Sequence, residues 1–214
     1  MIENFKNSSE YARKLFRIDD NIIEEIERES LKENVPIITR EILNFMIFEA
    51  ERIKAANILE IGTATGFSGL FLARTANKNK GMLTTIEIDN KRYEKAVENF
   101  KKAGILEKNK LILGDALEEI PKLNIENKFD FIFIDASKGQ YKKFFEMCYE
   151  LLSDNGTIFI DNIMFRGTVA ESEENSPKRY RTIVKRLKEF IDELSRKHNF
   201  VLLPFGDGVG IVRK

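Results

Sequence analysis

Residues 131–138 have the sequence FIFIDASK, and residues 157–162 have the sequence TIFIDN. Each segment contains a continuous apolar run rich in isoleucine and phenylalanine, the pattern of a β-strand buried on both faces. Each run stops at an acidic residue, so a carboxylate is expected where the strand ends. In open α/β sheets, ligands bind at the carboxyl ends of the strands. The two segments therefore predict a buried parallel sheet with a polar site at its edge.

Three oxygen-bearing side chains follow these runs directly. Asp135, Asp161 and Asn162 offer the hard donors that Mg²⁺ and Ca²⁺ prefer. Lys138 follows Asp135 closely in the sequence. This arrangement predicts a small metal-assisted active site, although a lysine at this position could also be an ordinary surface residue at a helix start.

From residue 57 onward, strand and helix patterns alternate with short connections, as in a parallel sheet with right-handed crossovers. Strands are expected over 57–61, 82–87, 110–113, 129–134 and 156–160, and helices over 67–76, 90–103, 115–123 and 139–151. Two or three helices are expected within 8–54, a loop over 161–177, a basic helix over 178–197 and a closing hairpin of strands 200–204 and 208–213. The prediction is a single α/β domain over residues 1–214, with a seven-stranded, mostly parallel sheet, an antiparallel last strand and helices on both faces.

The composition excludes several classes of protein. The 35 basic residues balance the 35 acidic ones, so the net charge gives no argument for nucleic-acid binding. One cysteine and one histidine exclude a zinc site built from those ligands, and the lone cysteine fits a reducing compartment. No run approaches the roughly 18 apolar residues of a membrane span. We therefore expect a cytoplasmic protein without a membrane partner.

The stretch of residues 60–68, EIGTATGFS, predicts a strand that runs through a glycine turn into a helix. Such a turn allows a ligand to approach the backbone and the free N–H groups of the helix start. Its glycine spacing differs from the dinucleotide fingerprint, and a P-loop lysine is absent, which argues against NAD and ATP. Glu87, at the end of the next strand, suits a ribose diol, whereas Asp89 fits a helix cap better. Asp115, after the third strand, could accept from an adenine amino group or cap a helix.

These motifs taken together carry a resemblance to a known family. The series EIGTATGFS, IEID, GDA, FIDASK and DN is similar to the class I S-adenosylmethionine-dependent methyltransferases. Within that class, the chain resembles the cation-dependent O-methyltransferases of the catechol and caffeoyl-CoA type. The strings DASKGQY and DNIMFRG, residues 135–141 and 161–167, resemble the bacterial branch that methylates 5-hydroxyuridine at the tRNA wobble position.

The resemblance implies a Rossmann-like fold, a homodimer, and N-terminal helices over residues 1–55 that contribute to the donor and acceptor sites. It also implies a set of residues that bind S-adenosylmethionine. This set comprises Val35, Glu60, Gly62 and Ser68 at the methionine end, Glu87 at the ribose, Asp115 and Ala116 at the adenine, and Asp135.

For the acceptor side, the resemblance implies that Asp135, Asp161 and Asn162 bind Mg²⁺ or another hard divalent cation. Lys138 would contact the substrate and take the acceptor proton. Arg166 could clamp a phosphate of the acceptor nucleotide. Residues 178–188 hold six basic residues and no acidic one, and could extend that contact over the anticodon stem-loop or form an ordinary solvated helix face.

The favoured function is thus methylation of the wobble 5-hydroxyuridine to 5-methoxyuridine. One alternative is a Mg²⁺-dependent O-methyltransferase of small catechol-like or phenolic acceptors, which the zero net charge favours. The acid that orients catechol in the animal enzymes has no match in the turn 206–210. A second alternative is a non-catalytic S-adenosylmethionine-binding module, against which the intact metal ligands and Lys138 argue.

Overall fold

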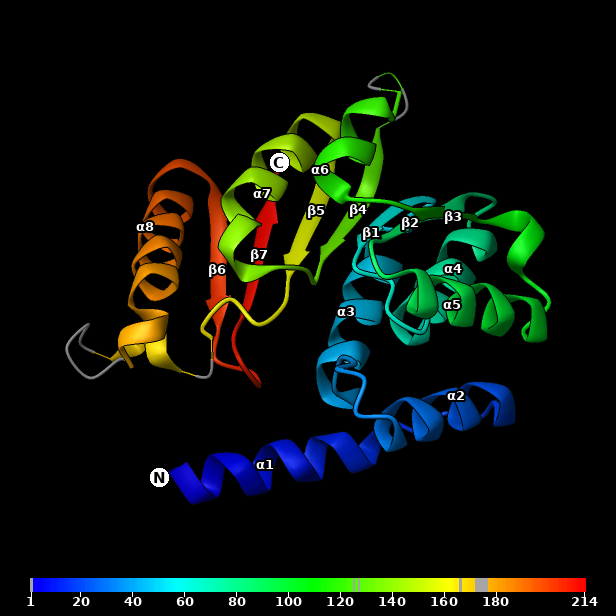
Figure 1. Cartoon of the computed structure of the whole chain (residues 1–214), viewed down its shortest axis with the longest axis horizontal. Helices are drawn as coiled ribbons and strands as arrows, with labels where there is room; N and C mark the ends of the chain where they lie inside the picture. The colour runs from blue at the N-terminus through cyan, green and yellow to red at the C-terminus, as the bar shows by residue number, and fades with distance from the viewer. Residues whose placement is uncertain (1, 125, 127, 166, 172–176) are drawn as a thin grey trace. The chain divides into compact units, whose positions relative to one another are not determined.

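The computed structural model describes residues 2–124, 126, 128–165, 167–171 and 177–214, with side chains described from residue 7 onward. The chain forms two compact units, Met1–Asp115 and Ala116–Lys214, which Figure 1 colours from blue to green and from green to red. Seven strands are present in the described residues, three in the first unit and four in the second.

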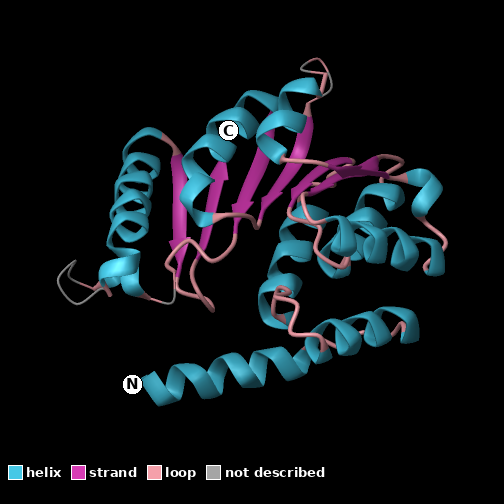
Figure 2. Ribbon diagram, in the orientation of Figure 1, coloured by secondary structure: helices cyan, strands magenta, loops and turns pink. Residues whose placement is uncertain are grey.

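The first unit contains three N-terminal helices followed by an alternation of strands and helices (Figure 2). Its elements are α1 (Ile2–Leu15), α2 (Asn21–Lys32), α3 (Arg40–Arg52), β1 (Asn57–Ile61), α4 (Phe67–Lys78), β2 (Met82–Glu87), α5 (Asn90–Lys102), the 3₁₀ turn η1 (Leu106–Lys108) and β3 (Lys110–Leu113). The strands lie in the order β3-β2-β1, and both neighbouring pairs are parallel. This matches the predicted alternation, because each crossover between parallel strands needs a helix of its own.

The second unit ends in an antiparallel hairpin. Its elements are α6 (Ala116–Glu119), η2 (Ile120–Lys122), β4 (Phe129–Ile134), η3 (Lys138–Gln140), α7 (Tyr141–Leu151), β5 (Leu152–Ile160), η4 (Thr168–Ala170), η6 (Lys178–Tyr180), α8 (Arg181–Lys197), β6 (Asn199–Leu203) and β7 (Val209–Arg213). The strand order is β4-β5-β7-β6; β4 and β5 are parallel, and β7 is antiparallel to both of its neighbours. The predicted closing hairpin is therefore present.

Several predicted boundaries differ from the observed ones, most clearly those of the helix over 115–123, the basic helix and the strand over 156–160. The helix expected over 115–123 is a short α6 followed by a 3₁₀ turn that contains Pro121, because proline cannot donate the hydrogen bond that an α-helix needs there. The basic helix begins with the turn η6, and α8 starts only at Arg181. Strand β5 begins at Leu152, since Phe129 pairs with Leu152 before the register shifts. No helix in the described part of the chain has the length and apolarity needed to cross a membrane.

Close backbone contact at Gly81 leads to a prediction about stability. A Cβ atom added to Gly81 would lie 2.0 Å from the carbonyl oxygen of Ala56, so Gly81→Ala must move the backbone that joins α4 to β2. Overpacking of this kind costs about 1–3 kcal/mol and sometimes more, and we expect a loss at the upper end in the free energy of unfolding, measured by urea denaturation. Gly139→Ala is the control, because an added Cβ meets nothing within 4 Å among the described residues. Equal effects of the two changes would contradict the prediction.

Candidate active site

The glycine turn between β1 and α4 is held against the end of β2. The backbone N–H of Gly62 donates to the carbonyl of Ile86 (2.9 Å). Ala64 has a φ of 47°, a conformation that residues with a Cβ rarely adopt, and its N–H donates to the Glu87 carboxylate at 2.7 Å. Glu87 thereby fixes the turn. The turn's glycines at 62 and 66 have φ values of 98° and 90°.

A buried carboxylate lies behind this turn. Glu60 is fully buried, and its two carboxylate oxygens accept hydrogen bonds from the hydroxyls of Ser68 and Thr85, each at 2.6 Å. Hydroxyl donors hold a carboxylate in place without neutralising its charge. A Cβ added to Gly69 would come within 2.8 Å of Glu60 Oε2, so the glycine makes room for the carboxylate beside α4. The structure thus brings Glu60, Gly62 and Ser68 together at this turn.

The turn also depends on polar residues that the sequence did not single out. The Thr65 hydroxyl hydrogen-bonds the Ser30 hydroxyl of α2 (2.8 Å), and its carbonyl accepts from the Asn99 amide of α5 (2.8 Å). The backbone N–H of Val35 donates to the carbonyl of Ser30 (2.9 Å), which brings Val35 close to the turn. Ser30 and Asn99 are both buried; a polar residue on the apolar face of an amphipathic helix was the signal that could have found them.

Besides Glu60, three acids of the first unit lie at or just after the ends of β2 and β3. Glu87 is 5% exposed and accepts a second hydrogen bond from the N–H of Asp89 (2.8 Å). Asp89 caps α5 by accepting from the N–H of Arg92 (2.9 Å), the role that the sequence favoured for it. The N–H of Gly114 donates to the carbonyl of Glu87 (2.9 Å). The next residue, the half-buried Asp115, therefore lies close to the end of β2. Ala116, the next residue, is buried.

In the second unit, strand register brings two carboxylate-bearing residues side by side. Ile134 and Ile160 are direct partners on the parallel strands β4 and β5, and Asp135 and Asp161 follow them. The N–H of Asp161 donates to the carbonyl of Ile134 (3.1 Å). The N–H of Asn162, which has a φ of 58°, donates to Asp161 Oδ1 at 2.7 Å. All three residues predicted as cation ligands therefore lie just beyond the ends of two neighbouring strands.

The electrostatics of this site centre on Asp161, which is only 2% exposed. Burial, and next the charge of Asp135, raise the pKa of the Asp161 carboxyl to about 8, although the Asn162 N–H and Lys138 act in the opposite direction. The pKa of Tyr141 is likewise raised, first by burial and then by Asp135 and Asp161. The buried Asp161 carboxyl thus lies in a position where both burial and the charge of the half-buried Asp135 disfavour its ionised form.

Lys138 and Tyr141 come from the segment after β4. Lys138 begins η3 and is half-buried, close enough to lower the pKa of Asp161. Tyr141 is 1% exposed, and its hydroxyl donates to the carbonyl of Asp161 (2.9 Å), so the start of α7 supports the end of β5. The sequence did not single out Tyr141, because an aromatic residue at this place looks like ordinary core.

A further acid, Asp207, reaches the site from the turn between β6 and β7. The N–H groups of Met164 and Ile163 donate to the carbonyls of Asp207 (2.8 Å) and Gly208 (3.0 Å), and the charge of Asp207 raises the pKa of Asp161. Asp207 was not among the predicted site residues, because the turn was expected only to join the two strands of the closing hairpin. Arg166, the predicted phosphate clamp, lies outside the described residues.

The donor set suits a hard divalent cation. The described residues contain no group of three or more His, Cys, Asp or Glu side chains arranged as metal ligands, because the set here is two carboxylates and the Asn162 amide. A buried carboxyl whose pKa is raised by a neighbouring carboxylate needs either a proton or a cation beside it. Oxygen donors of this kind fit Mg²⁺ or a similar ion.

Comparison with known proteins identifies the family. A family model described as O-methyltransferase matches residues 12–214. The chain belongs to the O-methyltransferase family. This O-methyltransferase is 31% identical over 181 residues to the caffeoyl-CoA O-methyltransferase of Stellaria longipes, covering 81% of this chain and 73% of that protein. It is 35% identical over 135 residues to the catechol O-methyltransferase of Niastella koreensis, covering 62% of this chain and 61% of that protein.

A solved structure supports both the fold and the enzyme class. The SAH-bound methyltransferase of Podospora anserina superimposes on this O-methyltransferase with a TM-score of 0.86 at 28% identity, covering 99% of this chain and 95% of that chain. The predicted Rossmann-like methyltransferase fold with an antiparallel last strand is confirmed. The predicted enzyme class, an S-adenosylmethionine-dependent O-methyltransferase, is confirmed as well.

The raised pKa of Asp161 predicts how stability depends on pH in the cation-free O-methyltransferase. The folded state holds the Asp161 proton more tightly than the unfolded state does. The bound proton therefore stabilises the folded state fully below the ordinary pKa of 3.8, and this stabilisation is lost as pH rises to about 8. We expect the midpoint of thermal unfolding to fall over this range, and to fall less in Asp161→Asn, which cannot ionise. Adding Mg²⁺ at pH 8 should restore the wild-type midpoint. Superimposable pH profiles of the two proteins would contradict this prediction.

Proposed function

We propose that this O-methyltransferase transfers the methyl group of S-adenosylmethionine to a hydroxyl that has a second oxygen beside it. The observation that carries the proposal is the pairing of Ile134 with Ile160, which aligns Asp135 with Asp161 at one sheet edge. Asp135, Asp161 and Asn162 would hold the divalent cation. When bound, the cation supplies positive charge that lowers the pKa of the acceptor hydroxyl and fixes its orientation.

The proposed roles on the donor side follow from the glycine turn. Glu60, Gly62 and Ser68 hold the methionine end, with Val35 packing near it. Glu87 binds the ribose hydroxyls, Asp115 and Ala116 bind the adenine, and Asp135 also contacts the donor. The buried charge of Glu60, which the Ser68 and Thr85 hydroxyls hold in place, suits a donor that carries an ammonium and a sulfonium group.

Lys138 is the proposed proton acceptor. The acceptor oxygen attacks the methyl carbon in line with the breaking carbon–sulfur bond, its proton passes to the Lys138 amine, and S-adenosylhomocysteine leaves. A base must be neutral to accept a proton, and positive charge nearby favours the neutral amine. Because the donor is already reactive, alignment of the two reactants supplies most of the rate enhancement.

The proposed acceptor is 5-hydroxyuridine at the tRNA wobble position, where the 5-hydroxyl and the 4-carbonyl form a chelating pair. The strings DASKGQY and DNIMFRG and the basic side chains of 178–188 support this acceptor. A second candidate is a small phenolic diol, which the names of the relatives from Stellaria longipes and Niastella koreensis favour. We further propose that the protein is a homodimer located in the cytoplasm, where either acceptor would be accessible to it.

Parallel assays decide between the two acceptors. Purified protein with S-adenosylmethionine and Mg²⁺ is given an anticodon stem-loop that carries 5-hydroxyuridine, and separately catechol and caffeoyl-CoA. We expect kcat/KM to be highest for the stem-loop. Mass spectrometry of tRNA from cells that lack the gene should then show 5-hydroxyuridine in place of its methyl ether; unchanged tRNA, with turnover of the diols alone, would overturn the RNA acceptor.

A further inference from the structure

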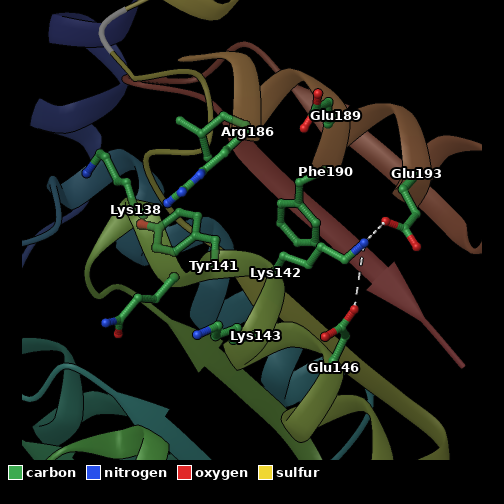
Figure 3. A pocket seen from close by; sticks show the side chains of 12 residues that line it. Lys138, Tyr141, Lys142, Lys143, Glu146, Arg186, Glu189, Phe190 and Glu193 are labelled. Atoms are coloured by element: carbon green, nitrogen blue, oxygen red, sulfur yellow. Dashed lines mark hydrogen bonds and ion pairs between the residues drawn. The ribbon is translucent and has the colours of Figure 1, made fainter. Parts of the chain in front are cut away.

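A pocket of about 580 Å³ lies within the second unit, between the segment 138–146 and α8 (Figure 3). Its lining includes the buried rings of Tyr141 and Phe190 and the buried side chain of Leu187. Charged side chains surround these buried apolar groups. Four are basic and three are acidic: Lys138, Lys142, Lys143, Arg186, Glu146, Glu189 and Glu193.

The charges are not spread evenly. Lys142 donates to the Glu193 carboxylate (2.5 Å) and lies 3.8 Å from that of Glu146. Glu193 also accepts from Lys197 at 2.8 Å, and these two lysines lower its pKa to about 2. Figure 3 shows this ion-paired group at one end of the pocket. Two of the three acidic side chains are therefore compensated by lysines.

The remaining basic side chains are not compensated in the same way. Arg186 and Lys138 lie at the other end of the pocket, and Lys143 lies below Tyr141 (Figure 3). Within the described ranges, Arg186 and Lys143 form neither an ion pair nor a hydrogen bond. We call Lys143 and Arg186 the basic end. Exposed cations in a concave surface without a carboxylate partner attract an anionic ligand.

The basic end is connected to the candidate active site. Tyr141 lines the pocket and also hydrogen-bonds the carbonyl of Asp161 (2.9 Å). Lys138, the proposed base, also lines the pocket. A ligand held at the basic end would therefore be anchored next to the proposed acceptor site.

We propose that the basic end binds a phosphate group of the acceptor, and so positions the hydroxyl that is methylated. This inference rests on the proposed function for the position of the acceptor. Arg186 can offer a fork of N–H donors to phosphate oxygens, and Lys143 adds a point charge. An RNA phosphodiester and the phosphates of a coenzyme A thioester share this chemistry, and the test below distinguishes them.

The test compares Arg186→Gln and Lys143→Gln with Arg196→Gln, a control on the same helix. Arg196 does not line the pocket and pairs with Asp192 at 2.9 Å. In the Mg²⁺-loaded enzyme, each pocket variant should raise KM for the stem-loop about tenfold, the loss typical of one hydrogen bond to a charged group. Values of kcat, and KM for the phosphate-free nucleoside 5-hydroxyuridine, should stay unchanged. The slope of log affinity against log salt should fall by about one per variant.

Two further measurements separate this inference from the proposed acceptor. Titration of inorganic phosphate, followed by phosphorus NMR without any acceptor, should show binding that Arg186→Gln weakens and Arg196→Gln does not. If phosphate binding is lost in the pocket variants but only caffeoyl-CoA is methylated, with KM raised in those variants, the RNA acceptor is wrong and the phosphate subsite stands. If the pocket variants and the control behave alike with phosphate, stem-loop and caffeoyl-CoA, the inference is overturned, whichever acceptor is methylated.

Discussion

Replacement of Asp161 by asparagine is expected to reduce turnover by about 10²–10³-fold at saturating donor and Mg²⁺, the size of effect seen when a preorganised electrostatic group is removed. Asparagine has the same shape and can still accept the Asn162 N–H, which lies 2.7 Å from Asp161 Oδ1. The change therefore removes charge without removing the local hydrogen bond. Steady-state kinetics with a phosphate-free diol and with the stem-loop measure the effect.

Asp154→Asn is the matched control for this change. Asp154 lies on the same strand, β5, but is exposed, so the same loss of charge should leave turnover unaltered. Chelation of divalent cations should reduce wild-type activity to the level of Asp161→Asn, and added Mg²⁺ should restore only the wild type. Retention of a tenth or more of the activity by Asp161→Asn would show that Asp161 is not a cation ligand.

The same substitution is expected to have opposite effects on activity and on stability. In cation-free protein at pH 7, wild type must either protonate Asp161 or hold a buried negative charge next to Asp135, because the pKa of Asp161 is about 8. Asparagine has no such requirement, so the folded variant should be as stable as wild type or more so. If Asp161→Asn loses turnover but unfolds at a higher temperature than wild type, the loss of activity is due to the candidate active site and not to misfolding.

Replacement of Lys138 by alanine is expected to lower kcat by about 10²–10⁴-fold, the contribution typical of a positioned general base. The KM for S-adenosylmethionine should change little, because Lys138 is not among the residues proposed to bind the donor. Activity of the variant should rise with pH as the acceptor hydroxyl ionises without help. A pH–rate profile with the diol acceptor records this rise.

Lys138→Arg separates the two roles that a lysine can have here. Arginine keeps the positive charge but cannot lose its proton in proteins. If Lys138 is the base, Lys138→Arg should be nearly as inactive as Lys138→Ala. If Lys138 has only an electrostatic role, Lys138→Arg should remain active. Full turnover of Lys138→Ala at saturating donor and Mg²⁺ would rule out the base assignment.

Several features could be predicted because their causes are local. The apolar runs that end at Asp135 and Asp161 correspond to β4 and β5, and the alternation of strand and helix gave the parallel order of the sheet. Glycines at 62 and 66 adopt positive φ, as a strand that turns sharply into a helix requires. Boundaries were less accurate: Pro121 shortened one helix, and the irregular pairing of Phe129 lengthened β5.

Other features depend on contacts between segments far apart in the chain. Ser30 meets Thr65 across 35 residues, and Lys142 meets Glu193 across 51. Neither pair has a spacing that marks it, and Asp207 looked like one residue of a glycine-rich turn. That Arg186 has no ion-pair partner among the described residues is visible only once the partners of its neighbours are known.

The sequence by itself determined the fold class and the residue types at the strand ends, because hydrophobic period and turn chemistry act over a few residues. Only the tertiary structure decided which of these residues meet. The register of β4 and β5 aligns Asp135 with Asp161, and the packing of α7 and α8 divides a mixed set of charges into an ion-paired end and a basic end. Burial and the distance between charges exist only in the folded chain, and these two quantities set the electrostatics on which the proposed chemistry depends.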